Sequence, residues 1–405
     1  MKHLKGHFTD AVICTDLVDS KTLDQVHDLI NNECSVGSKV VIMADCHAGM
    51  GCVIGTTMTI HDRVVPNLVG VDIGCGMLTL PLGNIEIDYE KLDKVIRAKI
   101  PSGHNIHNVN EPSRTHSDLN DLRCFEATTR DYLAIGTLGG GNHFIEIDVD
   151  YKGNKYLIIH SGSRNLGKRV ADHYTKLALT RYEKEQKEHG LEYIKANYPS
   201  SEWQNEITKL SKATASVNKD LLYLTGEDMA NYLHDMEICQ GYALFNRLVI
   251  AWEIFTGMKW DTHLKWGKIH KNIIHTIHNY IEIETKILRK GAIRALKDEL
   301  CVIPINMRDG VLLVKGKGNV EYNCSAPHGA GRILSRSQAR KNVNLDDFKE
   351  SMKGIYSTSV NKDTIDESPM VYKPIEAILD NIKEMVDVVE ILKPVYNFKA
   401  TEEWR

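Results

Sequence analysis

The sequence lacks the features that would place it among membrane proteins, secreted proteins or strongly basic nucleic-acid binders. Its 405 residues carry a formal net charge of -4, so no global basic field points to a polyanionic partner. No apolar run approaches the length of a membrane span, and the start, MKHLKGHFTDAV, has no apolar signal core. We therefore expect a cytoplasmic protein without a membrane segment, in which any phosphate site depends on a local patch.

Paired cysteines are also missing. The nine cysteines are odd in number, scattered, and never spaced as CxxC, so the pattern of a structural zinc site is absent. Several lie in apolar runs such as DAVICTDL and ELCVIPI, where cysteine packs as a small hydrophobic residue. This usage predicts a reduced intracellular protein without a disulfide framework.

Glycine-punctuated strands are predicted on both sides of a helical middle part. Residues 39–80 fit several strands, and the same alternation of strand and turn returns in KYLIIHSGSRNLG and LCVIPINMRDGVLLVKGKGNVEYNCSAPHGAGR. Residues 101–130 are polar and aperiodic, which is typical of a long loop. Because polar residues of interest lie at strand ends before and after the helices, the sequence predicts a single compact α+β domain over residues 1–405. Its stacked β-sheets would be surrounded by helices.

The helical part is expected as an excursion over about residues 169–300. Val170, Tyr174 and Ala178 recur at helical spacing, and Gly190 fits a helix C-cap. Further helices are predicted in EDMANYLHDMEICQGYALFNRLVIAWEIF and in KPIEAILDNIKEMVDVVEIL near the end of the chain.

One predicted strand, GVDIGCGMLTL at residues 70–80, contains two residues that do not suit an apolar core. Asp72 and Cys75 lie between glycines and large apolar side chains. An ionised carboxylate in such a strand costs several kcal/mol unless a cation or hydrogen-bond donors compensate it. The pair therefore suggests a bound cation.

Four histidines lie in comparable places. His143 follows a triple glycine in LGGGNHFIEI, His160 ends the strand KYLIIH, and His328 lies in the turn CSAPHGAGR. His278, in IIHTIHNYIEIE, is expected on a helix. Each one alone is more often a hydrogen-bonded packing residue than a ligand. As a set, imidazoles beside glycine at element ends favour a shared site.

One carboxylate, one thiolate and several imidazoles suit a transition metal, whereas magnesium and calcium prefer oxygen ligands. The Cys75 thiolate could bridge two metals, which at about 3.5–4 Å apart clamp a phosphoryl group and its attacking oxygen. The turns LGGGN and PHGAGR would offer backbone N–H groups to phosphate, although neither is a Walker loop or a GxGxxG turn. Phosphate chemistry is therefore predicted.

A row of basic residues follows His328. Arg332, Arg336 and Arg340 are spaced by four and are expected on one helix face. The row fits either a solvated helix face or a strip that contacts RNA phosphates.

Six separated motifs together resemble the RtcB family of RNA ligases. They are DIGCGM, GGGNHFIEI, HSGSRNLG, RKGA, CSAPHGAGR and ILKPVYNFKA, and the resemblance covers residues 39 to 400. It implies a GTP- and manganese-dependent ligase, acting in tRNA splicing or RNA repair. Such a ligase joins RNA 3′-phosphate or 2′,3′-cyclic phosphate ends to 5′-hydroxyl ends, through a guanylylated histidine and an RNA 3′-end carrying GMP.

The resemblance also implies roles for individual residues. His328 would be the guanylylated nucleophile, Asp72, Cys75 and His143 would hold one manganese ion, and Cys75, His160 and His278 would hold the other. Asp45 matches an acidic position near the site. RNA phosphates would contact Arg164, Arg332, Arg336 and Arg340. GTP contacts are expected from Asn142, His143, Phe144, Ile145, Glu146, His278, Asn279, Pro304, Ile305, Asn306, Met307, His328, Gly329, Ala330, Gly331 and Lys399, with Glu146 and Lys399 at the guanine.

One motif departs from the family pattern. Many members carry PGSMGT near the nucleotide, whereas this chain has PINMRDG at 304–310, like a shorter subgroup of the family. Ile305 and Asn306 replace the glycine and serine, so nearby phosphate contacts are expected to differ. The protein is expected to act as a monomer on RNA, with archease as a possible activating partner.

Two other functions remain open at this level. A dinuclear phosphoesterase acting on RNA ends would use the same metal ligands but would not need His328 or Lys399. A non-catalytic RNA-binding protein would need only the arginine row.

Overall fold

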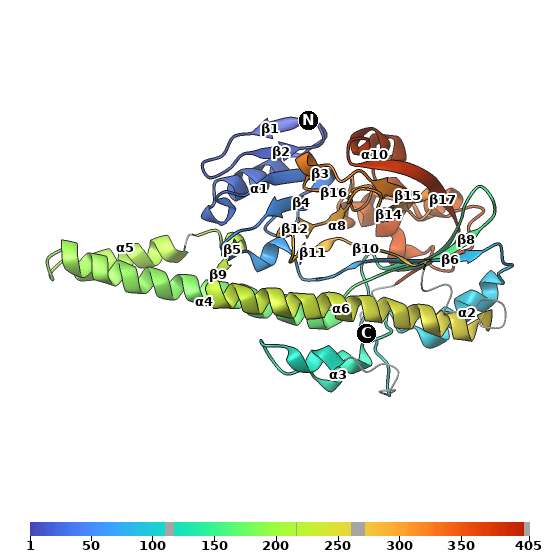
Figure 1. The fold of residues 1–405 in the computed structure, drawn as a ribbon, viewed down its shortest axis with the longest axis horizontal. Helices are drawn as coiled ribbons and strands as arrows, with labels where there is room; N and C mark the ends of the chain where they lie inside the picture. Colours follow the sequence, from blue (N-terminus) through green and yellow to red (C-terminus); the bar gives the residue numbers. More distant parts are fainter. Residues whose placement is uncertain (110–116, 216, 261–271, 401–405) are drawn as a thin grey trace.

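The computed structural model describes residues 1–109, 117–215, 217–260 and 272–400, and within them it combines two large β-sheets with surrounding helices (Figure 1). The predicted α+β class is therefore confirmed. No helix among these residues is both long enough and apolar enough to cross a membrane. Part of the predicted polar loop, residues 110–116, lies outside the described residues.

The first sheet has six strands in the order β1-β2-β3-β4-β12-β11. Only β2 and β3 pair in parallel, and helix α1 (Ser20–Ile30) packs its apolar face against this sheet, because Val26 and Ile30 share a core with Ile42 of β3. The strands are β1 (Lys2–Leu4), β2 (Ala11–Ile13), β3 (Val40–His47), β4 (Ile54–Thr59), β12 (Ile287–Lys290) and β11 (Asn279–Glu282).

The second sheet has seven strands in the order β10-β6-β8-β7-β17-β15-β14, and it curls until its two edges meet. The Val302 N–H of β14 donates to Thr276 Oγ1 of β10 at 3.2 Å. Apolar side chains such as Met77, Ile158 and Leu392 fill the concave side. The strands are β10 (Ile274–Ile277), β6 (Gly76–Gly83), β8 (Lys155–Ser161), β7 (Phe144–Val149), β17 (Val386–Lys399), β15 (Gly310–Gly316) and β14 (Leu300–Asn306).

Two long helices run beneath the sheets (Figure 1), α4 (Arg164–Asn197) and α6 (Gly226–Gly257). Helix α6 has buried residues on most of its surface because it serves two cores. Tyr232 and Met236 join the core of the first sheet, and Ile254 joins the core of the second. The remaining elements are α2 (Tyr89–Lys99), α3 (Thr129–Leu133), α5 (Trp203–Ala215), α8 (Arg336–Asn342), α9 (Leu345–Ser351), α10 (Ile375–Ile382), and the strand pairs β5 (Arg63–Val64) with β9 (Leu224–Thr225) and β13 (Ala292–Arg294) with β16 (Ser325–Pro327).

Three predictions about the helices were wrong. Gly190 lies inside α4 instead of ending it, because α5 packs there and a Cβ at this position would lie 2.3 Å from Leu210 Cδ2. The late predicted helix stops at Ile382, and β-branched VDVVEIL continues as β17, paired with β15 and β7. The helical excursion also ends earlier than residue 300, because 274–294 form the strands β10 to β13.

Candidate functional site

A tight turn before β6 carries Asp72 and Cys75, so these residues precede the strand in which they were predicted. Gly74 has a φ of +70°, and a Cβ there would lie 2.9 Å from the Gln240 Cα of α6, so the turn needs glycine at this position. Cys75 is 3% exposed. The turn therefore places an oxygen and a sulfur ligand at one end of the second sheet.

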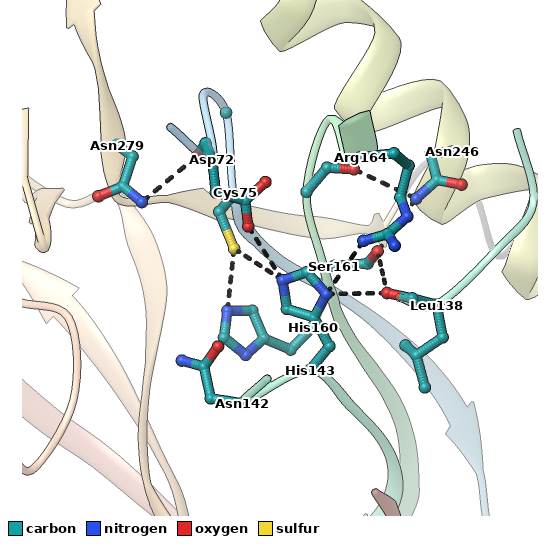
Figure 2. Close-up of polar contacts among 12 residues, drawn as sticks. Asp72, Cys75, Leu138, Asn142, His143, His160, Ser161, Arg164, Asn246 and Asn279 are labelled. Atoms are coloured by element: carbon teal, nitrogen blue, oxygen red, sulfur yellow. Dashed lines mark hydrogen bonds and ion pairs between the residues drawn. The ribbon is translucent and has the colours of Figure 1, made fainter. Parts of the chain in front are cut away.

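The order of the strands brings two histidines to this end of the sheet. Cys75 Sγ lies 3.4 Å from His143 Nε2 and 3.3 Å from His160 Nε2. His143 Nε2 is also 3.0 Å from Asp72 Oδ2. Figure 2 shows these side chains converging from the turn, from the residue just before β7 and from β8. The ligand atoms of Cys75, His143 and His160 lie within 4.8 Å of one another, a separation that suits a bound metal.

His278 completes the group, although it lies between β10 and β11 and not on a helix as predicted. The loop is held close to the turn, because the His278 N–H donates to the Cys75 carbonyl at 3.0 Å. The centre of the His278 ring is 5.2 Å from the centre of the His160 ring and 4.9 Å from the centre of the His328 ring. Nδ1 of both His160 and His278 is buried without a hydrogen-bond partner among the described residues. Such orphaned nitrogens fit metal ligation, because a buried polar atom otherwise costs free energy.

Burial sets the charge of these groups. It raises the pKa of Cys75 well above the usual thiol value, and the neighbouring Asp72 carboxylate adds to this. Burial lowers the pKa of His160 and of His278 well below the usual range. For Asp72, burial acts to raise the pKa, but the contact with His143 lowers it overall. His160 and His278 thus offer neutral imidazoles beside the Asp72 carboxylate, a donor set that fits a transition-metal cation.

A buried arginine that the sequence analysis missed holds the strands in place. Arg247 of α6 is fully buried, and its Nη1 donates to the carbonyls of Gly74 at 3.0 Å and Ser161 at 2.5 Å. These residues adjoin Cys75 and His160. The only signal in the sequence was a charged residue within the apolar helix FNRLVIAWEIF.

A cavity of about 300 Å³ opens beside the cluster. Most of the predicted GTP contacts line this cavity. Three do not: the side chain of Ile145 lies in the core on the other face of β7, and neither His143 nor Asn279 borders the cavity. Asn279 instead donates to the Asp72 carbonyl at 3.3 Å and accepts from the Gly291 N–H at 2.9 Å. The lining includes these predicted GTP contacts: Asn142, Phe144, Glu146, His278, Pro304, Ile305, Asn306, Met307, His328, Gly329, Ala330, Gly331 and Lys399. It also includes seven residues that were not predicted as GTP contacts: His47, Ile54, His160, Arg332, Arg336, Tyr372 and Asn397.

His328 also lines this cavity, and a contact with Asp45 fixes the orientation of its ring. Its Nδ1 is 2.7 Å from Asp45 Oδ2, which also accepts from the N–H groups of His328 and Gly329 at 3.2 Å each. Asp45 is fully buried at the middle of β3. Because Nδ1 lies against this carboxylate, Nε2 is the ring nitrogen left for chemistry.

Glu146 also lines the cavity. Its Oε2 accepts from Asn397 Nδ2 at 2.7 Å. Burial raises the pKa of Glu146 to about 7, against the lowering effects of Asn397 and Lys399. This carboxyl is therefore ready to change protonation near neutral pH.

The arginine row does not form one helix face. Arg332 precedes α8, and only Arg336 and Arg340 lie on it. All three pair with two buried carboxylates of the short 3-10 helix 362–367, at distances of 2.9–3.6 Å: Asp366 with Arg336 and Arg340, and Glu367 with Arg332 and Arg336. The row is thus neither a simple solvated face nor a free strip.

Arg164 begins α4 with a φ of +57°, an uncommon conformation for a residue other than glycine. Its Nε donates to Thr137 Oγ1 at 3.2 Å, and Nη1 lies 3.4 Å from His143 Nδ1. With Asp72 and Lys168 it borders a second cavity of about 410 Å³, next to the metal-ligand cluster.

Comparison with known proteins shows the family of the chain. The family model described as tRNA-splicing ligase RtcB matches residues 25–123 and 114–400. The chain belongs to the RtcB family. It is 28% identical to the RNA-splicing ligase RtcB of Escherichia coli (strain K12), over 89% of this chain and 90% of that protein. It is 26% identical to the tRNA-splicing ligase RtcB of Aeropyrum pernix, over 92% of this chain and 89% of that protein.

Proposed function

We propose that this RtcB-family protein is a GTP-dependent RNA ligase that joins 3′-phosphate or 2′,3′-cyclic phosphate ends to 5′-hydroxyl ends. The observation that carries the proposal is one cavity that joins the metal-ligand cluster to His328. His160, His278 and His328 all line it, as does Glu146. Family membership and the names of the relatives support the same reaction class.

Two manganese ions are proposed as cofactors. Asp72, Cys75 and His143 would hold one ion, and Cys75, His160 and His278 the other, so that the Cys75 thiolate bridges them. The ions would offset the charge of the GTP triphosphate and orient it. The protein's part is to hold the ligands at the end of β6, β7 and β8 and to exclude water from most of the cluster.

His328 is proposed as the nucleophile toward the α-phosphorus of GTP. Its Nε2 lone pair forms the P–N bond, the bond from phosphorus to the bridging oxygen breaks, and pyrophosphate leaves with that electron pair. Asp45 holds the Nδ1 side of the ring and stabilises the charge that the imidazole acquires. Glu146 and Lys399 would contact the guanine.

The GMP would then pass from His328 to the RNA 3′-phosphate. Attack by the 5′-hydroxyl on that phosphate forms the phosphodiester and releases GMP, and a cyclic phosphate is first opened by water in the same site. Arg164, Arg332, Arg336 and Arg340 are proposed to contact RNA phosphates. Sealing in tRNA splicing or RNA repair would be the corresponding role.

The first test is covalent labelling of the protein with α-labelled GTP and manganese. Wild-type protein should retain a label that is labile in acid and stable in alkali, as a phosphoramidate is. The His328→Ala variant should take no label but still seal RNA whose 3′-phosphate already carries GMP. His47→Ala is the matched control, because His47 lines the same cavity without a proposed catalytic role, and it should keep the label.

Two results would contradict the proposal. Wild-type rates of labelling in His328→Ala would place the nucleophile elsewhere. Release of phosphate from RNA 3′ ends by a wild-type protein that never takes label would identify a phosphoesterase instead.

A further inference from the structure

Glu367 is a buried carboxylate behind the cavity wall, at the end of the 3-10 helix Lys362–Glu367. Each of its oxygens has two polar partners. Oε2 lies 3.1 Å from Lys399 Nζ and accepts from Tyr372 Oη at 2.7 Å. Oε1 lies 3.3 Å from Arg332 Nη1 and 3.1 Å from Arg336 Nη2. Burial acts to raise the pKa of Glu367, but the three cations lower it overall, so the group is ionised.

All four partners of Glu367 line the cavity, whereas Glu367 itself does not border it. The carboxylate therefore acts on a ligand only through these side chains. Among them, Lys399 is nearly as buried as Glu367, with 7% of its side chain exposed. A buried ammonium needs a close anion, because leaving it unpaired in a low-dielectric site is costly.

The cavity contains a second carboxyl group that competes for Lys399. Lys399 acts electrostatically on Glu146, whose Oε2 already accepts from Asn397. At present the lysine is directed elsewhere: Nζ contacts Glu367, donates to the Asn142 carbonyl at 3.3 Å, and lies 4.8 Å from the centre of the Phe144 ring. Within the described part of the chain, the Glu146 carboxyl thus has no ion pair.

We propose that Glu367 is a positioning residue that sets base selectivity, by holding Lys399 away from Glu146 so that the Glu146 carboxylate stays free to accept guanine N–H donors. This inference rests on the proposed GTP site. If Glu367 loses its charge, the Lys399 ammonium pairs with Glu146 instead. The two residues line the same cavity, and Glu146 lies opposite Asn397 in the pairing of β7 with β17, two residues along β17 from Lys399. That ion pair occupies the acceptor that distinguishes guanine from adenine.

The Glu367→Gln substitution tests this, because it keeps the size of the side chain and removes only the charge. Equilibrium dissociation constants for GTP and ATP, measured with manganese present, should show a preference for GTP in the wild type. In Glu367→Gln that preference should fall by about tenfold or more, because charge-assisted hydrogen bonds to the base are lost while triphosphate contacts remain.

Asp366→Asn is the matched control. Asp366 is the adjacent buried residue and pairs with Arg336 and Arg340, with no contact to Lys399. Its substitution disturbs the same helix and one of the same arginines, Arg336, and the preference for GTP should remain. Lys399→Met provides a second route, because it removes the ammonium that would otherwise pair with Glu146. In a Lys399→Met background, adding Glu367→Gln should no longer lower the preference for GTP.

The outcomes separate this inference from the proposed function. An unchanged ratio of GTP to ATP affinity in Glu367→Gln overturns the inference alone, as does an equal loss of affinity for both nucleotides. A further fall in the preference when Glu367→Gln is added to Lys399→Met also overturns it. A wild-type protein that does not prefer GTP overturns both the inference and the proposed GTP site. If Glu367→Gln alone does not fold, as judged by its thermal unfolding, the comparison of Lys399→Met with and without Glu367→Gln decides, because neither of these variants leaves an unpaired ammonium.

Discussion

At the scale of single residues, the thiol of Cys75 is the central group of the metal-ligand cluster. It lies within 3.4 Å of both His143 and His160, and burial holds its pKa well above the usual thiol value. A metal must therefore displace the thiol proton, so its affinity should increase as the pH rises. The same central position makes Cys75 the residue on which both proposed ions depend.

Cys75→Ser is expected to lose both manganese ions together, because a hydroxyl does not replace a bridging thiolate. Metal analysis of the purified variant provides the measurement. Cys14→Ser is the control, since Cys14 is equally buried but belongs to a separate apolar core, and it should retain the metals. Two ions per chain at wild-type affinity in Cys75→Ser would show that the thiolate is not the bridge.

At the scale of elements, ion pairs join the 3-10 helix Lys362–Glu367 to Arg332 and to helix α8. The arginines in these pairs differ in how far they are buried. Arg332 is 16% exposed at its side chain and pairs with buried Glu367, whereas Arg340 is 52% exposed and lies 3.6 Å from Asp366. The two arginines were predicted as members of one row, and the structure gives them different environments. Their substitutions should therefore have different effects.

Arg332→Gln should destabilise the fold by about 3 kcal/mol, because it removes one partner of a buried pair. Arg340→Gln should change the free energy of unfolding by less than about 1 kcal/mol. It should instead lower the slope of log RNA affinity against log salt by about 0.7, as expected for one lost phosphate contact on a single strand. Denaturant unfolding and RNA titrations at several salt concentrations give the two values. An unchanged salt slope would make Arg340 a solvated residue.

At the scale of the whole molecule, the proposed ligands come from segments far apart in the sequence. Residues 72–75 precede β6, His143 precedes β7, His160 lies in β8, and His278 follows β10. All four strands belong to the curled sheet, so a metal would link segments that separate on unfolding. A ligand that binds only the folded chain stabilises it in proportion to its affinity and concentration.

Manganese should therefore raise the thermal unfolding temperature of the wild type. At about 100 times its dissociation constant, the ion would contribute about 2.7 kcal/mol. Calorimetry with increasing manganese, and again after a chelator, measures this shift. Cys75→Ser should show no comparable shift. An equal shift in that variant would place the stabilising metal at another site.

The amino-acid sequence determined the chemical groups of the site and the class of fold. The sequence indicated four of the proposed ligands, because each lies within two residues of a glycine and next to an apolar run: Asp72, Cys75, His143 and His160. Side chains in such places can meet at one edge of a sheet. The strand pattern before and after the helices also predicted the α+β class. The chemical groups and the fold class depend on residues that are close together in the chain, so periodicity and local composition are enough to predict them.

The tertiary structure decided what depends on distant partners. VDVVEIL became a strand because β15 pairs with it, and the loop carrying His278 is held by a hydrogen bond to Cys75. Arg247 and Glu367 were not predicted as parts of the site, because their roles arise from groups tens to hundreds of residues away. A single sequence shows which side chains are charged or apolar. Burial and ion pairing, however, depend on how the folded chain packs. Burial and ion pairing in turn set the pKa values of the site residues and the positions of the cationic side chains around the cavity.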